Sequence, residues 1–170
     1  MHSIRAATIK DIPLIRELTY KVWPQTYLKI QTQEQVDYML EMMYSVSALE
    51  KQMNDGCEFI IAYDDKEPVG FASYQDTGDN IYKLHKLYVL ISQQGKGTGR
   101  FIIDYLCREI KQKKGKALHL QVNRFNTAKD FYNKLGFTVI AEQKLDIGNG
   151  FFMDDYIMEK KLTTTAGAIV

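Results

Sequence analysis

The sequence predicts an α+β fold with a mixed, mostly antiparallel central sheet of about seven strands, helices on both faces and one parallel pair of strands. Two observations support this prediction. Three strand-like runs lie between residues 58 and 89 at hairpin spacing, which favours antiparallel pairing. A strand, a helix and a strand then follow between residues 81 and 122, and such a crossover joins parallel strands.

The N-terminal part begins with a short strand and continues as helix. Residues 3–9 alternate enough for an edge strand. Asp11 is expected to cap a helix that has Pro13 in its first turn, where proline is tolerated. Pro24 is expected to end that helix, because proline lacks the backbone N–H that a helix interior requires.

The rest of the chain divides into further elements at polar, glycine-rich turns. Helices are expected where apolar residues recur at helical spacing, and strands where β-branched and aromatic residues cluster. The expected helices cover about 33–44, 46–53, 98–113 and 127–135, and the expected strands cover 58–63, 68–75, 81–89, 117–122, 137–145 and 151–160.

Composition indicates one compact domain. The chain has 170 residues, 45% of them hydrophobic, so we expect a single domain over 1–162 followed by a low-complexity tail over 163–170. The net charge of +1 argues against a nucleic-acid partner. A lysine cluster over 111–116 is interpreted as a solvated helix end.

Cysteine usage and hydropathy point to a cytoplasmic protein. Cys57 and Cys107 have no paired spacing and are interpreted as reduced core thiols. No apolar run approaches the roughly 20 residues of a membrane span, and residues 1–5 show no signal-peptide core, so no membrane partner is expected.

The most informative segment is a glycine-rich run over 94–100 between an expected strand and an expected helix. Bare N–H groups at a helix N-terminus favour phosphate. A dinucleotide fingerprint would need glycine where Arg100 or Ile102 stands, and a nucleotide-triphosphate loop would need Ser or Thr where Gly97 stands. The pattern that remains is Gln-x-x-Gly-x-Gly, although such a run alone could equally be a flexible turn.

A second motif lies at 126–137, which reads Asn-Thr-Ala-Lys-Asp-Phe-Tyr-Asn-Lys-Leu-Gly-Phe. The glycine run resembles the pyrophosphate loop of the Gcn5-related N-acetyltransferase (GNAT) family, and the second motif resembles the family's Asn…Ala-x-x-Phe-Tyr-x-Lys-x-Gly-Phe signature. Two such motifs in the right order are hard to obtain by chance. The resemblance implies a three-layer fold with a splayed parallel strand pair, and transfer of an acetyl group from acetyl-CoA to a primary amine by direct attack in a ternary complex.

The resemblance also implies which residues bind acetyl-CoA, the expected co-substrate. Backbone amides of the loop would hold the pyrophosphate, and backbone N–H groups before the loop would polarise the thioester carbonyl. Asn126 would lie near the pantetheine arm, with Asn123 as a competitor, and Lys134 could reach another phosphate. The candidates are Leu87, Tyr88, Val89, Gln94, Gly95, Lys96, Gly97, Thr98, Gly99, Arg100, Asn126 and Lys134.

Two side chains are candidates for moving protons. Tyr132 occupies the position of the family's general acid, although an aromatic residue there could also belong to the core. Many members carry a glutamate base on the strand before the loop, whereas this chain has His85 there, with an ordinary pKa of about 6.5. If His85 is only structural, water would take the proton. His2, His85 and His119 lack ligand spacing, so no metal is expected.

The resemblance further implies that the acceptor lies along the segment between the first strand and the first hairpin. Trp23, Tyr27 and Glu34 are the candidate substrate residues. Glu34, Asp37 and Glu41 share one helical face, and an acidic face near aromatic side chains would attract a polycation. A solvated amphipathic helix would show the same pattern.

Several functions remain open at this stage. The runs 23–27 and 155–160 are similar to a bacterial branch of the family that acetylates spermidine and spermine. Acetylation of a protein N-terminal amine, a lysine or a small amine antibiotic is an alternative, as is a non-catalytic acyl-CoA-binding regulatory module. The last strand and the tail could support a homodimer.

Overall fold

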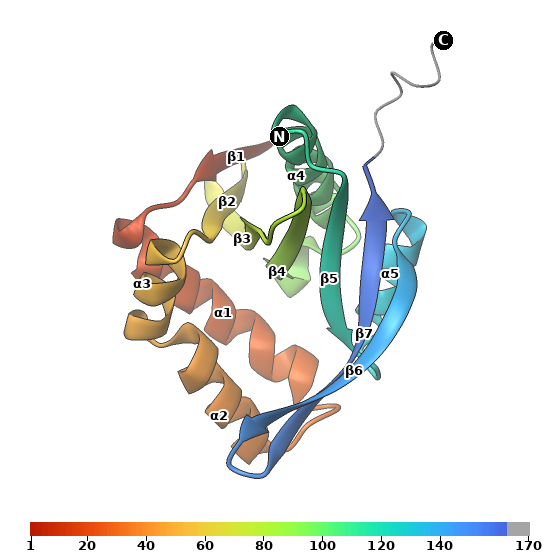
Figure 1. Ribbon diagram of the computed structural model, residues 1–170. Coiled ribbons are helices and arrows are strands. Elements are labelled where there is room, and N and C mark those ends of the chain that lie inside the picture. Colours follow the sequence, from red (N-terminus) through yellow and green to blue (C-terminus); the bar gives the residue numbers. More distant parts are fainter. Residues whose placement is uncertain (163–170) are drawn as a thin grey trace. The chain divides into compact units, whose positions relative to one another are not determined.

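The computed structural model describes residues 1–162, so the predicted tail over 163–170 lies outside the described residues (Figure 1). Short 3-10 helices are labelled η. In chain order the elements are β1 (His2–Ala6), η1 (Ile9–Asp11), α1 (Ile12–Tyr27), α2 (Gln33–Tyr44), α3 (Val46–Asn54), β2 (Glu58–Asp64), β3 (Glu67–Asp76), β4 (Ile81–Val89), η2 (Ile91–Gln93), α4 (Thr98–Gln112), β5 (Ala117–Asn123), α5 (Ala128–Lys134), β6 (Thr138–Gly148) and β7 (Phe151–Lys161).

The strands form a seven-stranded sheet in the order β1-β2-β3-β4-β5-β7-β6. β4 and β5 are parallel, with Ile81–Leu84 opposite Ala117–Leu120. The pairs β1–β2, β2–β3, β5–β7 and β6–β7 are antiparallel. The predicted α+β fold with a mostly antiparallel sheet and one parallel pair is therefore confirmed.

The chain divides into two compact units, and β4 contributes to both. Of the described residues, the first unit contains 1–75 and 85–102, and the second contains 76–84 and 103–162. The elements match the expected ranges closely, because alternating and helical apolar patterns mark the faces that are buried. Whether the chain functions as one domain stays a prediction.

The first unit buries an aromatic-rich core against strands β2 and β3. Trp23, Tyr44 and Phe71 are at most 1% exposed. Gly70 on β3 permits a close approach to β4, since a Cβ atom there would lie 2.6 Å from the Tyr88 carbonyl oxygen. This contact fixes the backbone of β4 just before the glycine-rich loop.

Two expectations about α1 are wrong. Asp11 precedes the helix but makes no side-chain cap, because its carboxylate instead accepts the Thr8 N–H at 2.8 Å and pairs with Arg5, also at 2.8 Å. Pro24 does not end the helix, which continues to Tyr27. The ring removes only one hydrogen bond there, and the Pro24 carbonyl still accepts from the Leu28 N–H at 3.2 Å.

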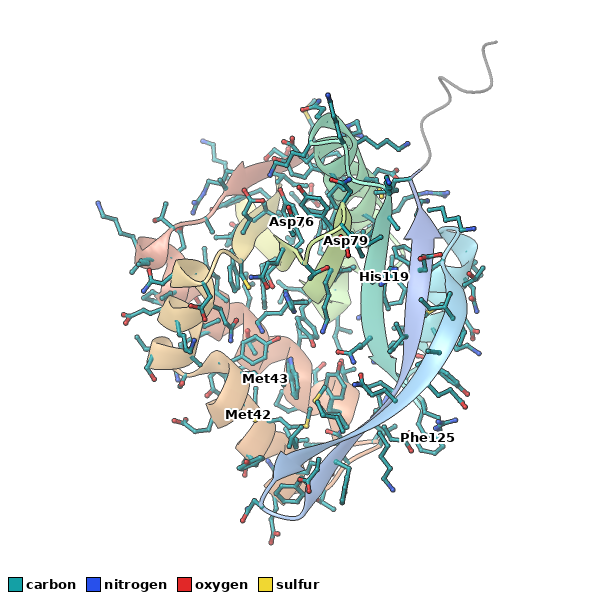
Figure 2. The ribbon with its side chains drawn as sticks, viewed as in Figure 1. Met42, Met43, Asp76, Asp79, His119 and Phe125 are labelled. Carbon is teal, nitrogen blue, oxygen red and sulfur yellow. The ribbon has the colours of Figure 1, made fainter. Side chains whose placement is uncertain are left out.

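The second unit buries apolar side chains of α4 and β5. Ile103, Leu106, Ile110 and Leu118 are fully buried. His119, which Figure 2 labels on β5, lies 2.8 Å from Glu159 on the antiparallel neighbour β7. β6 extends to Gly148, three positions beyond the expected end, because its pairing with β7 continues to the Gly148–Phe151 turn.

Candidate functional site

The glycine-rich loop turns directly from η2 into α4. Gly95 and Gly97 have φ angles of 82° and 81°, in the left-handed region that favours glycine. A Cβ atom at either position would meet nothing within 4 Å. The Phe101 N–H donates to the Gly97 carbonyl at 2.9 Å, so the amides of Thr98, Gly99 and Arg100 precede the first bond of the helix. The loop thus offers a group of backbone donors beside open space.

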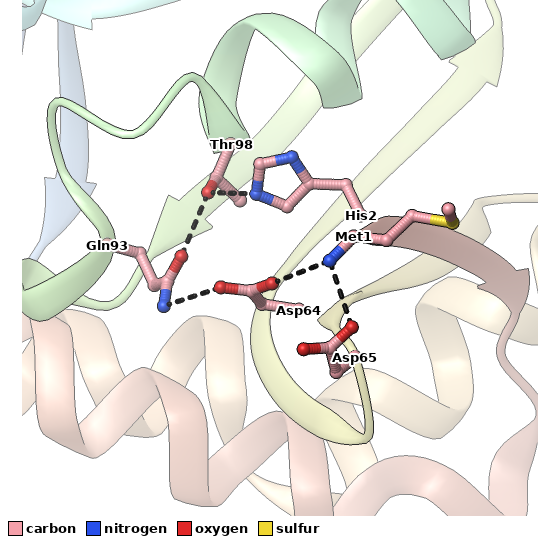
Figure 3. Close-up of polar contacts among 6 residues, drawn as sticks. All are labelled: Met1, His2, Asp64, Asp65, Gln93 and Thr98. Atoms are coloured by element: carbon pink, nitrogen blue, oxygen red, sulfur yellow. Dashed lines mark hydrogen bonds and ion pairs between the residues drawn. The ribbon is translucent and has the colours of Figure 1, made fainter.

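Side-chain hydrogen bonds brace this loop at Thr98 (Figure 3). The Thr98 hydroxyl, 1% exposed, donates to Gln93 Oε1 at 3.2 Å and lies 2.9 Å from His2 Nε2. Because that hydroxyl has only one proton, His2 is the donor in the second bond. Gln93 Nε2 reaches Asp64 at 3.4 Å, and the ammonium group of Met1 holds the pKa of Asp64 below its usual value.

Sequence reasoning missed Gln93 and His2, because it assigned only the backbone of Thr98 to the loop. His2 also stacks on Phe101 in the first turn of α4, with 5.3 Å between the ring centroids. These contacts fix both ends of the loop and thereby the direction of its amides.

Replacement of Thr98 by valine should loosen the loop. Valine keeps the shape but leaves the buried Gln93 oxygen without its donor, which should lower the free energy of unfolding by about 1–2 kcal/mol. Urea denaturation measures this loss, and Thr98→Ser, which keeps the hydroxyl, serves as the control. Equal stability of the valine variant and the wild type would show that the hydroxyl braces nothing.

The strand before the loop enters an aromatic cluster in the first unit. Tyr88 lies 5.6 Å from Phe71 and 6.0 Å from Trp23, measured between ring centroids. Its hydroxyl is 3.4 Å from that of Tyr27, and Tyr27 stacks on Trp23 at 4.3 Å. Burial raises the pKa of Tyr88, which stays neutral. The structure therefore brings together Trp23, Tyr27 and Tyr88.

A buried lysine that the sequence reasoning overlooked belongs to the same cluster. Lys86 is 7% exposed, and its Nζ lies 4.6 Å above the Tyr44 ring. A cation over an aromatic face is attracted by the ring quadrupole. The signal that could have identified it is the alternation along β4, which places Lys86 on the buried face with Tyr82 and Leu84.

The acidic residues of α2 face solvent, unlike the buried aromatic cluster. Glu34, Asp37 and Glu41 are exposed, and Asp37 accepts a hydrogen bond from Gln33 at 2.8 Å. The shared helical face is therefore observed, whereas its role in substrate binding stays a prediction.

His85 on β4 is exposed and oriented by Gln75. Its Nε2 lies 3.0 Å from Gln75 Oε1, and Gln75 Nε2 donates to the Asp55 carbonyl at 2.9 Å. Because the Gln75 oxygen can only accept, Nε2 of His85 carries the proton and Nδ1 is the basic nitrogen of the neutral ring.

The second unit holds the candidates from the second motif. Asn126 accepts the Ala128 N–H and Asn123 accepts the Phe125 N–H, each at 2.9 Å, so both side chains stabilise the turn before α5. Tyr132 is 9% exposed and makes edge contacts with Phe131 and Phe137 at 5.2 and 5.6 Å. Lys134 is exposed at the end of α5. The Tyr132 ring therefore belongs to the core of this unit.

An open groove of about 340 Å³ lies in the first unit beside the brace residue Gln93. Its walls come from α1, from the start of β3 and from the residues after β4. The lining residues are Leu14, Glu17, Leu18, Lys21, Glu67, Pro68, Val69, Leu90, Ser92 and Gln93. None of these is among the site residues predicted from the sequence.

Other classes of site were also sought over residues 1–162. No cluster of three His, Cys, Asp or Glu side chains in that range could hold a metal ion. Cys57 and Cys107 form no disulfide within that range; Cys107 is buried as expected, and burial raises its pKa, whereas Cys57 is half-buried rather than a core residue. No helix in the same range has the length and apolar character needed to cross a membrane.

Comparison with known proteins gives two partial sequence matches. A provisionally named acetyltransferase of Bacillus subtilis (strain 168) is 32% identical over 91 residues, which cover 54% of this chain and 60% of the relative. The [Ribosomal protein bS18]-alanine N-acetyltransferase of Haemophilus influenzae is 32% identical over 76 residues, which cover 45% of this chain and 51% of the relative. The matches thus span little more than half of each relative's length.

A solved structure and a family model match far more of the chain. The PaiA N-acetyltransferase of Thermoplasma acidophilum, crystallised with coenzyme A, superposes with a TM-score of 0.79 and 26% identity, covering 95% of this chain and 99% of that one. GNAT acetyltransferases use acetyl-CoA, the predicted co-substrate. The family model of the acetyltransferase (GNAT) domain matches residues 27–159. With its mixed sheet and parallel strand pair, the chain belongs to the GNAT acetyltransferase family.

Proposed function

We propose that this protein is an acetyl-CoA-dependent N-acetyltransferase that acts on a primary amine by direct attack in a ternary complex. The observation that carries the proposal is the loop over 94–100, whose two left-handed glycines present consecutive amides at the start of α4. Because the chain belongs to the GNAT family, we interpret these amides as the groups that bind acetyl-CoA.

The loop suits a pyrophosphate group. The space beside Gly95 and Gly97 is open, so a phosphate could approach the backbone closely. Lys96 and Arg100 are exposed and would add positive charge. Bound acetyl-CoA would supply an acetyl group activated as a thioester, and the backbone N–H groups of Leu87–Val89 are our candidates for polarising its carbonyl.

Two groups would handle protons. An alkylamine with a pKa near 10 arrives charged and must lose a proton, and the departing thiolate needs one. Tyr132 is the proposed donor, since its ring is fixed by Phe131 and Phe137. His85 is the proposed acceptor through Nδ1, because Gln75 orients the ring from the other nitrogen.

Replacement of His85 by alanine tests this role by pH dependence. The acidic limb of the pH profile of kcat/KM should shift or disappear, because a neutral imidazole is needed to take the proton. His119→Gln, which alters another sheet histidine, is the control and should keep the limb. An unmoved limb in His85→Ala would assign the proton to water or to another group.

The proposed acceptor is a polyamine, supported by the exposed acidic face of α2 and by the aromatic residues Trp23 and Tyr27. A protein N-terminal amine is the second candidate, and it is favoured by the partial identity to the bS18-alanine N-acetyltransferase. A lysine side chain is a third amine of the same chemistry.

Thiol release from acetyl-CoA tests the activity directly. The panel should contain spermidine, spermine, peptides with free N-terminal alanine, lysine peptides and aminoglycosides. Release with one amine class would establish transfer and identify the acceptor. If no amine causes thiol release but calorimetry shows tight binding of acetyl-CoA, a regulatory acyl-CoA-binding module is favoured instead.

We further propose that the protein acts in the cytoplasm without a nucleic-acid or membrane partner, in line with its net charge of +1. A homodimer through the last strands is also proposed, because β6 is an edge strand of the sheet. Analytical ultracentrifugation of the full chain would test the dimer.

A further inference from the structure

The proposed base His85 shares its hydrogen-bond acceptor with a thiol. Gln75 lies on β3, the strand next to β4 in the sheet, and is half-buried. Its Oε1 lies 3.0 Å from Nε2 of His85 and 3.5 Å from Sγ of Cys57. A carboxamide oxygen has two lone pairs, so it can accept from both donors at once. Gln75 thus connects the imidazole to the residue that precedes β2.

The orientation of the Gln75 carboxamide is fixed from its other side. Its Nε2 donates to the Asp55 carbonyl at 2.9 Å. A backbone carbonyl can only accept, so the amide nitrogen must face it and the amide oxygen must face the imidazole. The backbone of Asp55 therefore determines that Nε2 of His85 is the donor in the bond to Gln75.

The Asp55 carbonyl belongs to a turn that closes α3. Gly56 follows it with a φ of 101°, in the left-handed region that favours glycine. The Asp55 N–H donates to the Lys51 carbonyl at 2.8 Å, and the Gly56 N–H donates to the Met53 carbonyl at 3.2 Å. A Cβ atom at Gly56 would lie 3.7 Å from Nε2 of Gln75, so the turn packs directly on the amide. The C-terminal end of α3 thus holds the carbonyl that orients Gln75.

Charged and titratable side chains occur on every element that flanks His85. Lys51 pairs with Asp55, and the Asp76 carboxylate accepts the Gly78 N–H at 2.9 Å. The others are Cys57 and Glu58 at the start of β2, Tyr74 on β3, and Lys83 and Lys86 on β4. At Nε2 of His85, by contrast, the contact comes from an uncharged amide.

An uncharged acceptor at this nitrogen matters for a base. A carboxylate in the same place would stabilise the imidazolium and raise the pKa of the ring, so the ring would stay protonated to a higher pH. A protonated ring cannot take a proton from an amine. An amide oxygen orients the ring through the same N–H without adding a negative charge beside it.

We propose that Gln75 is a positioning residue for acetyl transfer, which holds His85 with Nδ1 as the proton acceptor and, being uncharged, keeps the ring neutral during turnover. This inference rests on the proposed function, because it assigns the group that prepares the proposed base. The proton that the acceptor ammonium loses is added at Nδ1 and afterwards leaves to water. The Nε2 proton stays in the bond to Gln75 throughout.

Gln75→Glu tests this role with two readouts. The titration midpoint of the His85 ring, followed by NMR, should rise by about 0.5–1 pH unit, a shift limited by the exposure of the pair. The acidic limb of the pH profile of kcat/KM should move to higher pH by a similar amount, because the base is protonated over a wider range. The chain has three histidines, so comparison with His85→Ala assigns the NMR signal.

Gln52→Glu is the matched control. Gln52 lies on α3 in the same unit, and its amide also donates to a backbone carbonyl, that of Met43, at 2.9 Å. The variant makes the same change of charge away from the imidazole, so the midpoint and the limb should both stay within about 0.2 pH unit of the wild type.

A second variant, Gln75→Met, removes the acceptor without adding charge. The ring then loses its fixed orientation, so kcat/KM should fall by about tenfold or more at every pH, with no upward movement of the limb. Activity equal to that of the wild type in Gln75→Met would contradict a positioning role.

The NMR midpoint separates this inference from the proposed function. In Gln75→Glu, a midpoint and a limb that rise together support the inference. An unmoved midpoint, or an unmoved limb beside a raised midpoint, overturns it, while acetylation of an amine by the same variant shows that the proposed activity stands. If even the wild type acetylates no amine, the proposed activity fails and the midpoint decides alone. A rise then supports the action of Gln75 on the ring, and no rise overturns it.

Discussion

Tyr132→Phe is expected to lower kcat for amine acetylation by about 100-fold or more while leaving coenzyme A affinity nearly unchanged. Loss of a positioned general acid typically costs this much, because the departing thiolate must then find its proton in water. The substitution removes only the hydroxyl. The ring keeps its edge contacts with Phe131 and Phe137 in a site that is 9% exposed, so the fold should persist.

A second tyrosine of the same unit supplies the control for this experiment. Tyr156 on β7 accepts a weak hydrogen bond from Arg124 at 3.5 Å, and it lacks any relation to the motif that identifies Tyr132. Tyr156→Phe should therefore keep kcat within about twofold of the wild type. If Tyr132→Phe also stays within that range, its ring serves packing alone, and the proton donor must be sought elsewhere.

The fold could be predicted well because its signals are local. Hairpin spacing over 58–89 and one strand-helix-strand crossover were enough to predict the antiparallel pair of β2 with β3 and the parallel pair of β4 with β5. The errors arose where tertiary contacts outweigh a local rule. Pro24 should end a helix in isolation, yet stacking of Tyr27 on Trp23 extends α1 by a turn beyond it.

The site could be predicted only where its residues are neighbours in the sequence. The loop over 94–100 is such a run, and the structure gives it the expected turn into α4. The hydrogen bond between His2 and Thr98 joins residues 96 positions apart, and no periodicity in the sequence predicts a contact over that separation.

Gly97→Ala is expected to weaken acetyl-CoA binding by about tenfold or more. At a φ of 81° an alanine is strained by about 1 kcal/mol, and relief of that strain would turn the amides of Thr98 and Gly99 away from their common direction. The added Cβ would also occupy the open space through which a phosphate must approach. Calorimetry with coenzyme A measures the loss of affinity.

Gly78→Ala provides a control with the same backbone cost. Gly78 has a φ of 99°, and a Cβ atom there also meets nothing within 4 Å, but it lies in the turn between β3 and β4. Both variants should therefore lose a similar amount of unfolding free energy, whereas only Gly97→Ala should lose coenzyme A affinity. Equal affinity in the two variants would mean that the glycine-rich run is only a turn, and that the pyrophosphate binds to another part of the chain.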